Sequence, residues 1–135
     1  MMFTIIFPVL NERLRLESGV TRTVEYLQSI AFEDYEIIIV DNGSEDETPQ
    51  IAENLCKKYD KVKYERINVR GVGAAFRRGV EVSHGDVVGY MDIDLSTNIR
   101  HLGEAIHLFE TQPEIQYING SRFARESDTR GRKWY

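Results

Sequence analysis

The amino-acid sequence predicts an α/β protein in which a mostly parallel sheet carries helices on both faces. Short apolar runs alternate along the chain with segments whose apolar residues recur every three or four positions. The run YEIIIV at residues 35–40 is rich in β-branched residues without alternation, which is typical of a strand covered on both sides. Strands that alternate with helices are joined by right-handed crossovers, and these crossovers place the strands parallel to one another.

Two strands and the helix between them are predicted at the start of the chain. Phe3–Val9 forms the first strand, and residues 35–40 form the second. The helix between them is recognised by apolar residues that share one face, namely Val20, Val24, Leu27 and Ile30.

A second helix and a third strand follow. Thr48 can cap this helix, and Pro49 suits its first position because a proline there removes no helical hydrogen bond. The apolar residues of this helix recur at intervals of four, at Ile51, Leu55 and Tyr59. Val62–Arg66 is predicted as the third strand.

The second half of the chain continues the alternation. A helix that starts with glycine spans residues 71 to about 83, and Val87–Met91 forms the fourth strand. Ser96 or Thr97 caps the next helix. The apolar face of that helix consists of Leu102, Ile106 and Phe109. A fifth strand is predicted at Gln116–Gly120.

Length, composition and charge indicate one soluble globular domain. The 135 residues are 41% hydrophobic and 29% charged, and their formal net charge of −5 argues against nonspecific binding of nucleic acid. No segment approaches the roughly 20 apolar residues that a membrane span requires. The single cysteine, Cys56, suits a reducing compartment. We therefore expect a cytoplasmic protein, which can lie peripherally at the cytoplasmic face of a membrane.

Polar clusters follow four of the predicted strands. They read PVLNER after the first strand, DNGSEDET after the second, DIDLST after the fourth and GSR after the fifth. In open parallel sheets, ligands bind beyond the carboxyl ends of the strands. The four clusters should therefore lie along one edge of the sheet and form the binding site.

Asp92 and Asp94 stand one residue apart where the fourth strand ends. One interpretation is a polar turn before a helix, because an acidic residue is favourable near a helix N-terminus. That accounts for one acid better than for two, since neighbouring carboxylates repel each other unless a cation lies between them. Mg²⁺ and Mn²⁺ prefer carboxylate oxygens and share their other positions with phosphates. The pair therefore favours a divalent metal site.

Other residues at this edge have a structural and a functional interpretation. Asp41 either forms a turn or accepts hydrogen bonds from a nucleotide base. Glu12 is a loop acid that could hold a base or a ribose. Gly71 and Gly73 allow a ligand to approach the backbone at a helix N-terminus, although a lone G-x-G is not a dinucleotide fingerprint. Arg122 is either a surface residue or a phosphate ligand.

Five motifs follow one another along the chain, namely FPVLNE, IVDNGSEDET, RGVGAAFRRG, GDVVGYMDIDLST and INGSR. Their order resembles that seen in glycosyltransferases of the GT-A fold, family 2. From residue 3 to about residue 122, the sequence most resembles the dolichyl- and polyprenyl-phosphate sugar transferases of that family. The resemblance implies a single GT-A catalytic domain over residues 1–135, with the Rossmann-like half that binds the nucleotide sugar. It also implies that the chain is truncated at its C-terminus relative to the family.

The resemblance implies roles for particular residues. The matched positions are Pro8, Glu12 and Asp41 for base and ribose; Gly71, Gly73 and Arg77 beside the nucleotide; Asp92 and Asp94 for the metal that bridges the diphosphate; and Arg122 on the phosphate or acceptor side. Asp92, Asp94 and Arg122 would then carry the catalysis, because negative charge grows on the leaving diphosphate.

The activity implied is an inverting transfer of a hexose from a UDP- or GDP-sugar to a lipid phosphate, with Mg²⁺ or Mn²⁺ as cofactor. Asn42 replaces a second aspartate that many members carry, and Ser96 replaces a glutamine of the mannosyl synthases, which favours a glucosyl-type enzyme. A homo-oligomer could complete the site. Two other classes remain open: a nucleotide-sugar-binding domain without turnover, and a phosphotransferase of the haloacid-dehalogenase type with Asp92 as nucleophile.

Overall fold

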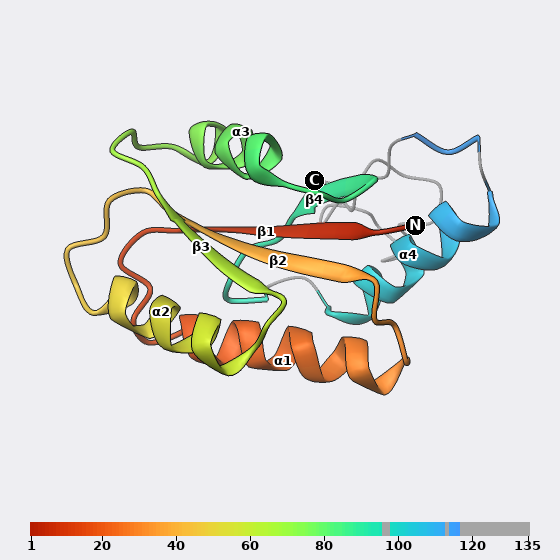
Figure 1. Cartoon of the computed structure of the whole chain (residues 1–135), viewed down its shortest axis with the longest axis horizontal. Coiled ribbons are helices and arrows are strands. Elements are labelled where there is room, and N and C mark those ends of the chain that lie inside the picture. The colour runs from red at the N-terminus through yellow and green to blue at the C-terminus, as the bar shows by residue number, and fades with distance from the viewer. Residues whose placement is uncertain (96–97, 113, 117–135) are drawn as a thin grey trace.

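The structure is a computed structural model, and it describes residues 1–95, 98–112 and 114–116. Strands and helices alternate strictly along these residues (Figure 1). The strands are β1 (Phe3–Val9), β2 (Tyr35–Asp41), β3 (Val62–Arg66) and β4 (Val87–Tyr90). The helices are α1 (Leu16–Ser29), α2 (Thr48–Lys58), α3 (Val72–Val82) and α4 (Arg100–Thr111).

The described strands form one sheet with the order β3-β2-β1-β4, and every pair is parallel. β1 lies at the centre, where Phe3 pairs with both Tyr35 of β2 and Val87 of β4. The loops that follow β1, β2 and β3 gather at one edge, on the left of Figure 1. This carboxyl edge is where ligands bind in parallel α/β sheets. The prediction of an α/β fold with a mostly parallel sheet is confirmed.

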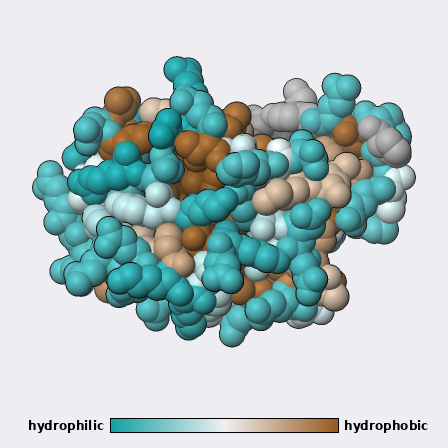
Figure 2. Space-filling model, in the orientation of Figure 1, coloured by the Kyte–Doolittle hydropathy of each residue, from teal (hydrophilic) through white to brown (hydrophobic). Residues whose placement is uncertain are grey.

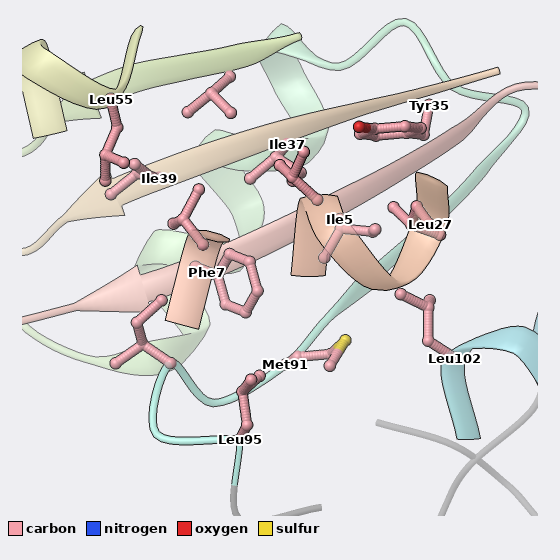
Figure 3. Close-up of a cluster of buried hydrophobic side chains, with 14 of the residues drawn as sticks. Ile5, Phe7, Leu27, Tyr35, Ile37, Ile39, Leu55, Met91, Leu95 and Leu102 are labelled. Atoms are coloured by element: carbon pink, nitrogen blue, oxygen red, sulfur yellow. The ribbon is translucent and has the colours of Figure 1, made fainter. Parts of the chain in front are cut away.

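Helices cover both faces of the sheet. Helices α1, α2 and α4 pack on one face over a large core, which includes Ile5, Phe7, Ile37 and Ile39 of the two central strands (Figure 3). Helix α3 packs on the other face, against Ile6, Ile38 and Val40. This division follows from the alternation of side chains along a strand. A Cβ atom at Gly79 of α3 would lie only 2.4 Å from Cδ1 of Ile6, so this helix approaches β1 closely.

The surface that faces the viewer in Figure 2 is covered mostly by hydrophilic residues, with hydrophobic residues dispersed among them. Among the described residues, no helix combines the length and the hydrophobicity of a membrane span.

The limits of some elements differ from the prediction. Thr48 is the first residue of α2 rather than its cap, and the N-cap residue, Glu47, makes no side-chain capping hydrogen bond. Helix α3 begins at Val72 and β4 ends at Tyr90, each within one residue of the predicted limit. The predicted caps of α4, Ser96 and Thr97, lie outside the described residues, as does the predicted fifth strand from residue 117 onward.

Candidate functional site

The loops that follow β1 and β2 are joined by hydrogen bonds. The backbone N–H of Asn11 donates to Oγ of Ser44 at 2.8 Å, and the side-chain oxygen of Asn11 accepts from the N–H of Glu45 at 2.8 Å. The N–H of Glu12 donates to Oγ1 of Thr48, also at 2.8 Å. Asn11 has a φ of 53°, a conformation that asparagine tolerates better than most residues. These contacts hold the two loops together as one wall of the carboxyl edge.

This hydrogen bond gives Thr48 and Glu12 roles beyond those predicted, which were a helix cap for Thr48 and a loop acid for Glu12. The Thr48 hydroxyl is fully buried and serves the β1–α1 loop instead of its own helix. The Glu12 carboxylate is 22% exposed and accepts a hydrogen bond from Nε of Arg15 at 2.9 Å. Glu12 thus stays accessible to a ligand, while its backbone is fixed by α2.

Asp41, at the end of β2, is fully buried. Its Oδ1 accepts from the N–H groups of Gly43 (3.1 Å) and Ser44 (2.7 Å). Its Oδ2 accepts from the hydroxyl of Tyr64 (2.7 Å) and from the guanidinium of Arg66 (3.3 Å). A carboxylate has about four acceptor positions, so all positions of Asp41 have partners within the chain. A nucleotide base could bond to Asp41 only by replacing one of them.

Tyr64 and Arg66 are site residues that the sequence analysis did not single out. Burial, together with the hydrogen bond donated to Asp41, raises the pKa of Tyr64 to about 12. Arg66 also donates to the carbonyl oxygen of Ser44 at 2.9 Å and remains 42% exposed. Both residues belong to β3, two positions apart, and therefore lie on the same face of that strand. The spacing of two residues at the carboxyl end of a predicted strand is the sequence feature that could have identified Tyr64 and Arg66 as candidate site residues.

Asp92 and Asp94 follow β4, and their side chains are exposed. The residues that alternate with them, Met91, Ile93 and Leu95, are buried in the large core and are at most 9% exposed. The N–H of Leu95 donates to the carbonyl oxygen of Asp92 at 3.0 Å, and Leu95 has a φ of 53°. Figure 3 shows Met91 and Leu95 below the sheet, among the residues of α1 and the central strands. The apolar residues thus anchor the segment and direct both carboxylates outward.

Gly19 of α1 lets the Asp92–Asp94 segment lie against this helix. A Cβ atom at position 19 would lie 2.3 Å from the carbonyl oxygen of Ile93 and 2.8 Å from its Cδ1. Since one of these atoms belongs to the backbone, a side chain at position 19 would force the segment away from α1. β4 pairs with β1, so this contact places the Asp92–Asp94 segment against the first turns of α1, the helix that follows the loop of Glu12.

Gly19→Ala is expected to displace Asp92 and Asp94. We expect a loss of about 1–3 kcal/mol in the free energy of unfolding, because the contact is overpacked, and a loss of about tenfold or more in metal-dependent ligand affinity. Thermal unfolding and calorimetric titration with Mn²⁺ and a nucleotide sugar measure the two effects. Ser18→Ala, at an exposed neighbouring position of α1, is the matched control. Unchanged affinity in a folded Gly19→Ala variant would contradict this role.

The glycine-rich segment, residues 69–73, comprises the end of the loop that follows β3 and the first two residues of α3, at the same edge. Gly71 is the N-cap residue of α3 and has a φ of 117°, which strongly favours glycine. A Cβ atom at Gly73 would contact nothing within 4 Å, so packing within the chain does not require glycine there. Arg77 is exposed, whereas Arg78 pairs with Glu65 at 2.9 Å. Of the two adjacent arginines, Arg77 is therefore better placed for a ligand.

The residues present fit a divalent ion that is shared with a phosphate ligand. No group of three or more His, Cys, Asp or Glu side chains that could hold a metal occurs within the described residues. Mg²⁺, however, is usually bound by one or two carboxylates together with water and substrate phosphates. The exposed pair Asp92 and Asp94 satisfies that requirement. Arg122 and Ser96, which the sequence analysis also placed at this edge, lie outside the described residues.

The parallel sheet with polar loops at its carboxyl edge defines the class of protein, an α/β domain that binds ligands at that edge. The sequence profile of the family described as Glycosyl transferase family 2 matches residues 4–135. The chain therefore belongs to this family. The match, together with the position of Asp92 after the fourth strand, argues against the haloacid-dehalogenase alternative.

Curated relatives are longer than this chain. Glycosyltransferase AglD of Haloferax volcanii is 35% identical over 122 residues, which are 89% of this chain and 19% of that protein. Dolichyl-phosphate beta-glucosyltransferase of Mus musculus is 32% identical over 143 aligned positions, covering 98% of this chain and 44% of that enzyme. The chain thus spans less than half the length of either relative.

Solved structures share the fold. The mannosyltransferase PcManGT of Pyrobaculum calidifontis, in complex with GDP-Man and Mn²⁺, matches 96% of this chain and 37% of its own, with a TM-score of 0.73 and 22% identity. Glucosyl-3-phosphoglycerate synthase of Mycobacterium tuberculosis, in complex with Mn²⁺, UDP and phosphoglyceric acid, matches 92% of this chain and 44% of its own, with a TM-score of 0.70 and 24% identity. The described part of the chain is therefore GT-A-like.

Proposed function

We propose that this chain is the donor-binding part of a metal-dependent, inverting glycosyltransferase, which transfers a hexose from a UDP- or GDP-sugar to a polyprenyl or dolichyl phosphate. The observation that carries the proposal is the outward direction of Asp92 and Asp94, whose neighbours Met91, Ile93 and Leu95 anchor the segment. The mouse relative, named for dolichyl phosphate, and the PcManGT complex with GDP-Man and Mn²⁺ support the acceptor and donor classes.

Asp92 and Asp94 would hold a Mg²⁺ or Mn²⁺ ion, which would supply positive charge to the leaving diphosphate. Gly71, Gly73 and Arg77 would lie beside that diphosphate. The first turn of α3, which has no side-chain cap, offers backbone N–H groups to negative charge at this place. Arg122 would add a further positive charge on the phosphate or acceptor side.

Pro8, Glu12 and Asp41 would line the place for the base and the ribose. Glu12 can accept hydrogen bonds from ribose hydroxyls, since its carboxylate is partly exposed. Asp41 differs, because a bond to a base N–H requires the Tyr64 hydroxyl or Arg66 to leave the carboxylate. A lipid-phosphate acceptor is already anionic, so its attack on the sugar requires no general base. The serine at position 96 favours a glucosyl donor.

Isothermal titration calorimetry with UDP- and GDP-sugars, each with and without Mn²⁺, tests the proposal. We expect binding that requires Mn²⁺ and that prefers one of the two nucleotides. Absence of binding to every donor would contradict the proposed function. Transfer of labelled hexose to a polyprenyl phosphate then distinguishes an enzyme from a domain that binds the donor without turnover.

Gly73→Ala is expected to weaken donor binding without weakening the fold. The added methyl group meets no other element within 4 Å among the described residues, and alanine favours a helix over glycine by up to about 1 kcal/mol. If the diphosphate lies against this backbone, the methyl group occupies its place, and we expect the Kd for the donor to rise by about tenfold. Calorimetry and thermal unfolding of the same sample separate the two effects. Donor affinity equal to that of the wild type would remove Gly73 from the site.

A further inference from the structure

Asn42 connects the end of β2 to the glycine-rich segment. Its Nδ2 donates hydrogen bonds to the carbonyl oxygens of Val69 (2.9 Å) and Gly71 (3.0 Å). Its backbone N–H donates to the carbonyl oxygen of Val9 in β1 at 2.9 Å. The residue is only 6% exposed. This single residue thus joins the two central strands, through its backbone, to the loop that precedes α3, through its side chain.

The two partners of this side chain require a hydrogen-bond donor. Carbonyl oxygens only accept, and the asparagine amide supplies two N–H groups from one nitrogen. An ionised aspartate at position 42 would instead hold a negative oxygen against two carbonyl oxygens in a buried place, which is unfavourable. Asparagine therefore suits this loop conformation better than an ionised aspartate does.

Apolar packing contributes little to holding the glycine-rich segment. Val69 is 61% exposed and Val72 is 50% exposed. Among the described residues, a Cβ placed at Gly71 or Gly73 would meet nothing within 4 Å apart from its chain neighbours and the backbone of its own helix. The N–H of Ile67 bonds to the carbonyl oxygen of Asp41 at 2.8 Å and fixes the start of the loop. The two bonds from Asn42 are then the contacts that fix its far end, where α3 begins.

We propose that Asn42 is a positioning residue, which holds the glycine-rich segment and the first turn of α3 in the conformation that accepts the diphosphate of the donor. The inference rests on the proposed function for the identity of the ligand. The hydrogen bonds that carry it do not depend on that function. Asn42 acts through the backbone of residues 69–71 and needs no contact with the donor.

Asn42→Asp tests the requirement for a donor group, because its effect should depend on pH. At pH 8 the carboxylate repels the two carbonyl oxygens, and we expect the Kd for the nucleotide sugar with Mn²⁺ to rise at least about tenfold relative to wild type. At pH 5 a protonated carboxyl group can donate one hydrogen bond, and burial favours this protonated form, so the ratio to wild type should fall to about threefold or less. Asn42→Ala should lose affinity equally at both pH values. Asn54→Asp, an exposed position on α2, is the control for the added charge.

Hydrogen exchange without any ligand provides a second measurement. The amides of residues 70–74 should exchange faster in Asn42→Asp than in Asn54→Asp at pH 8, while those of β1 and β2 stay protected. A loss of affinity that is equal at pH 5 and pH 8 in Asn42→Asp would overturn the inference, as would unchanged exchange. Faster exchange with unchanged donor affinity would also overturn it. If the wild type binds no donor, the proposed function fails, and the exchange result alone decides whether Asn42 holds the segment.

Discussion

Asp94→Asn is expected to reduce Mn²⁺-dependent donor binding by at least about a hundredfold, which is the effect typical of removing a group that holds charge at a reacting centre. Within the described residues, no third acidic, histidine or cysteine side chain joins Asp92 and Asp94 in a metal-binding group. The asparagine variant therefore removes one of the two negative charges that would face the proposed ion. Asp92→Asn should act in the same direction. Calorimetric titration of the donor at several Mn²⁺ concentrations measures the loss.

The fold should not change in these variants, because both aspartates are exposed and the core residues beside them are retained. Asp60→Asn is a matched control: it removes the same charge at an exposed position between α2 and β3, at the opposite edge of the sheet. A variant at position 94 that binds donor with the Mn²⁺ dependence of the wild type would refute the metal site. An equal loss in Asp60→Asn would show that only net charge matters.

The fold could be predicted from the sequence because the apolar pattern of each strand and helix can be recognised within its own residues. The residues 35–40 form a continuous buried strand, as their composition indicated, and the apolar face of α1 includes the predicted residues Val20, Val24 and Leu27. The parallel direction of the strands follows from helical crossovers between them, whereas the strand order β3-β2-β1-β4 was not predicted. Within the described residues, the errors lie at the ends of elements. Thr48 was expected to cap α2, but its hydroxyl oxygen instead accepts a hydrogen bond from the N–H of Glu12, in the distant β1–α1 loop.

The site was predictable only in part, because its residues act through partners that are distant in sequence. The exposure of Asp92 and Asp94 could be inferred from their alternation with apolar residues. The hydrogen bonds from Tyr64 and Arg66 to the Asp41 carboxylate could not be inferred, because they depend on the pairing of β2 with β3. The role of Asn42 depends likewise on the path of a loop 27 residues further along the chain. Residue type alone indicates the chemistry of such groups but not which contacts they make.

The sequence pattern also gives no indication of the role of Glu36, which lies inside the apolar run of β2 and is only 1% exposed. It occupies the amino end of the sheet, opposite the candidate site. Its carboxylate accepts hydrogen bonds from the Thr4 hydroxyl (2.7 Å), from Nζ of Lys63 (2.8 Å) and from the N–H of His84. The carboxylate therefore connects β1, β2 and β3 to the turn between α3 and β4.

These donors outweigh the effect of burial on the ionisation of Glu36. Burial alone would raise the pKa of Glu36, but the hydrogen bonds from His84, Lys63 and Thr4 hold it at about 2, below the ordinary 4.5. A carboxyl group whose pKa falls this far on folding contributes about 3 kcal/mol to the free energy of unfolding at neutral pH. Because the pKa is depressed in the folded state, the contribution is complete above about pH 4.5 and disappears as the pH falls toward 2.

Glu36→Gln should therefore lower the free energy of unfolding by about 3 kcal/mol at pH 7, and the difference from wild type should shrink progressively between pH 4.5 and pH 2. Denaturant unfolding at pH 7, 4 and 2.5 measures the difference. Glu25→Gln, at an exposed position of α1, is the control and should cost less than about 0.5 kcal/mol at each pH. A Glu36→Gln penalty that stays constant down to pH 2.5 would mean that packing, and not the buried charge, is what Glu36 contributes. Because the network lies at the edge away from the candidate site, the donor affinity of the folded variant should equal that of the wild type.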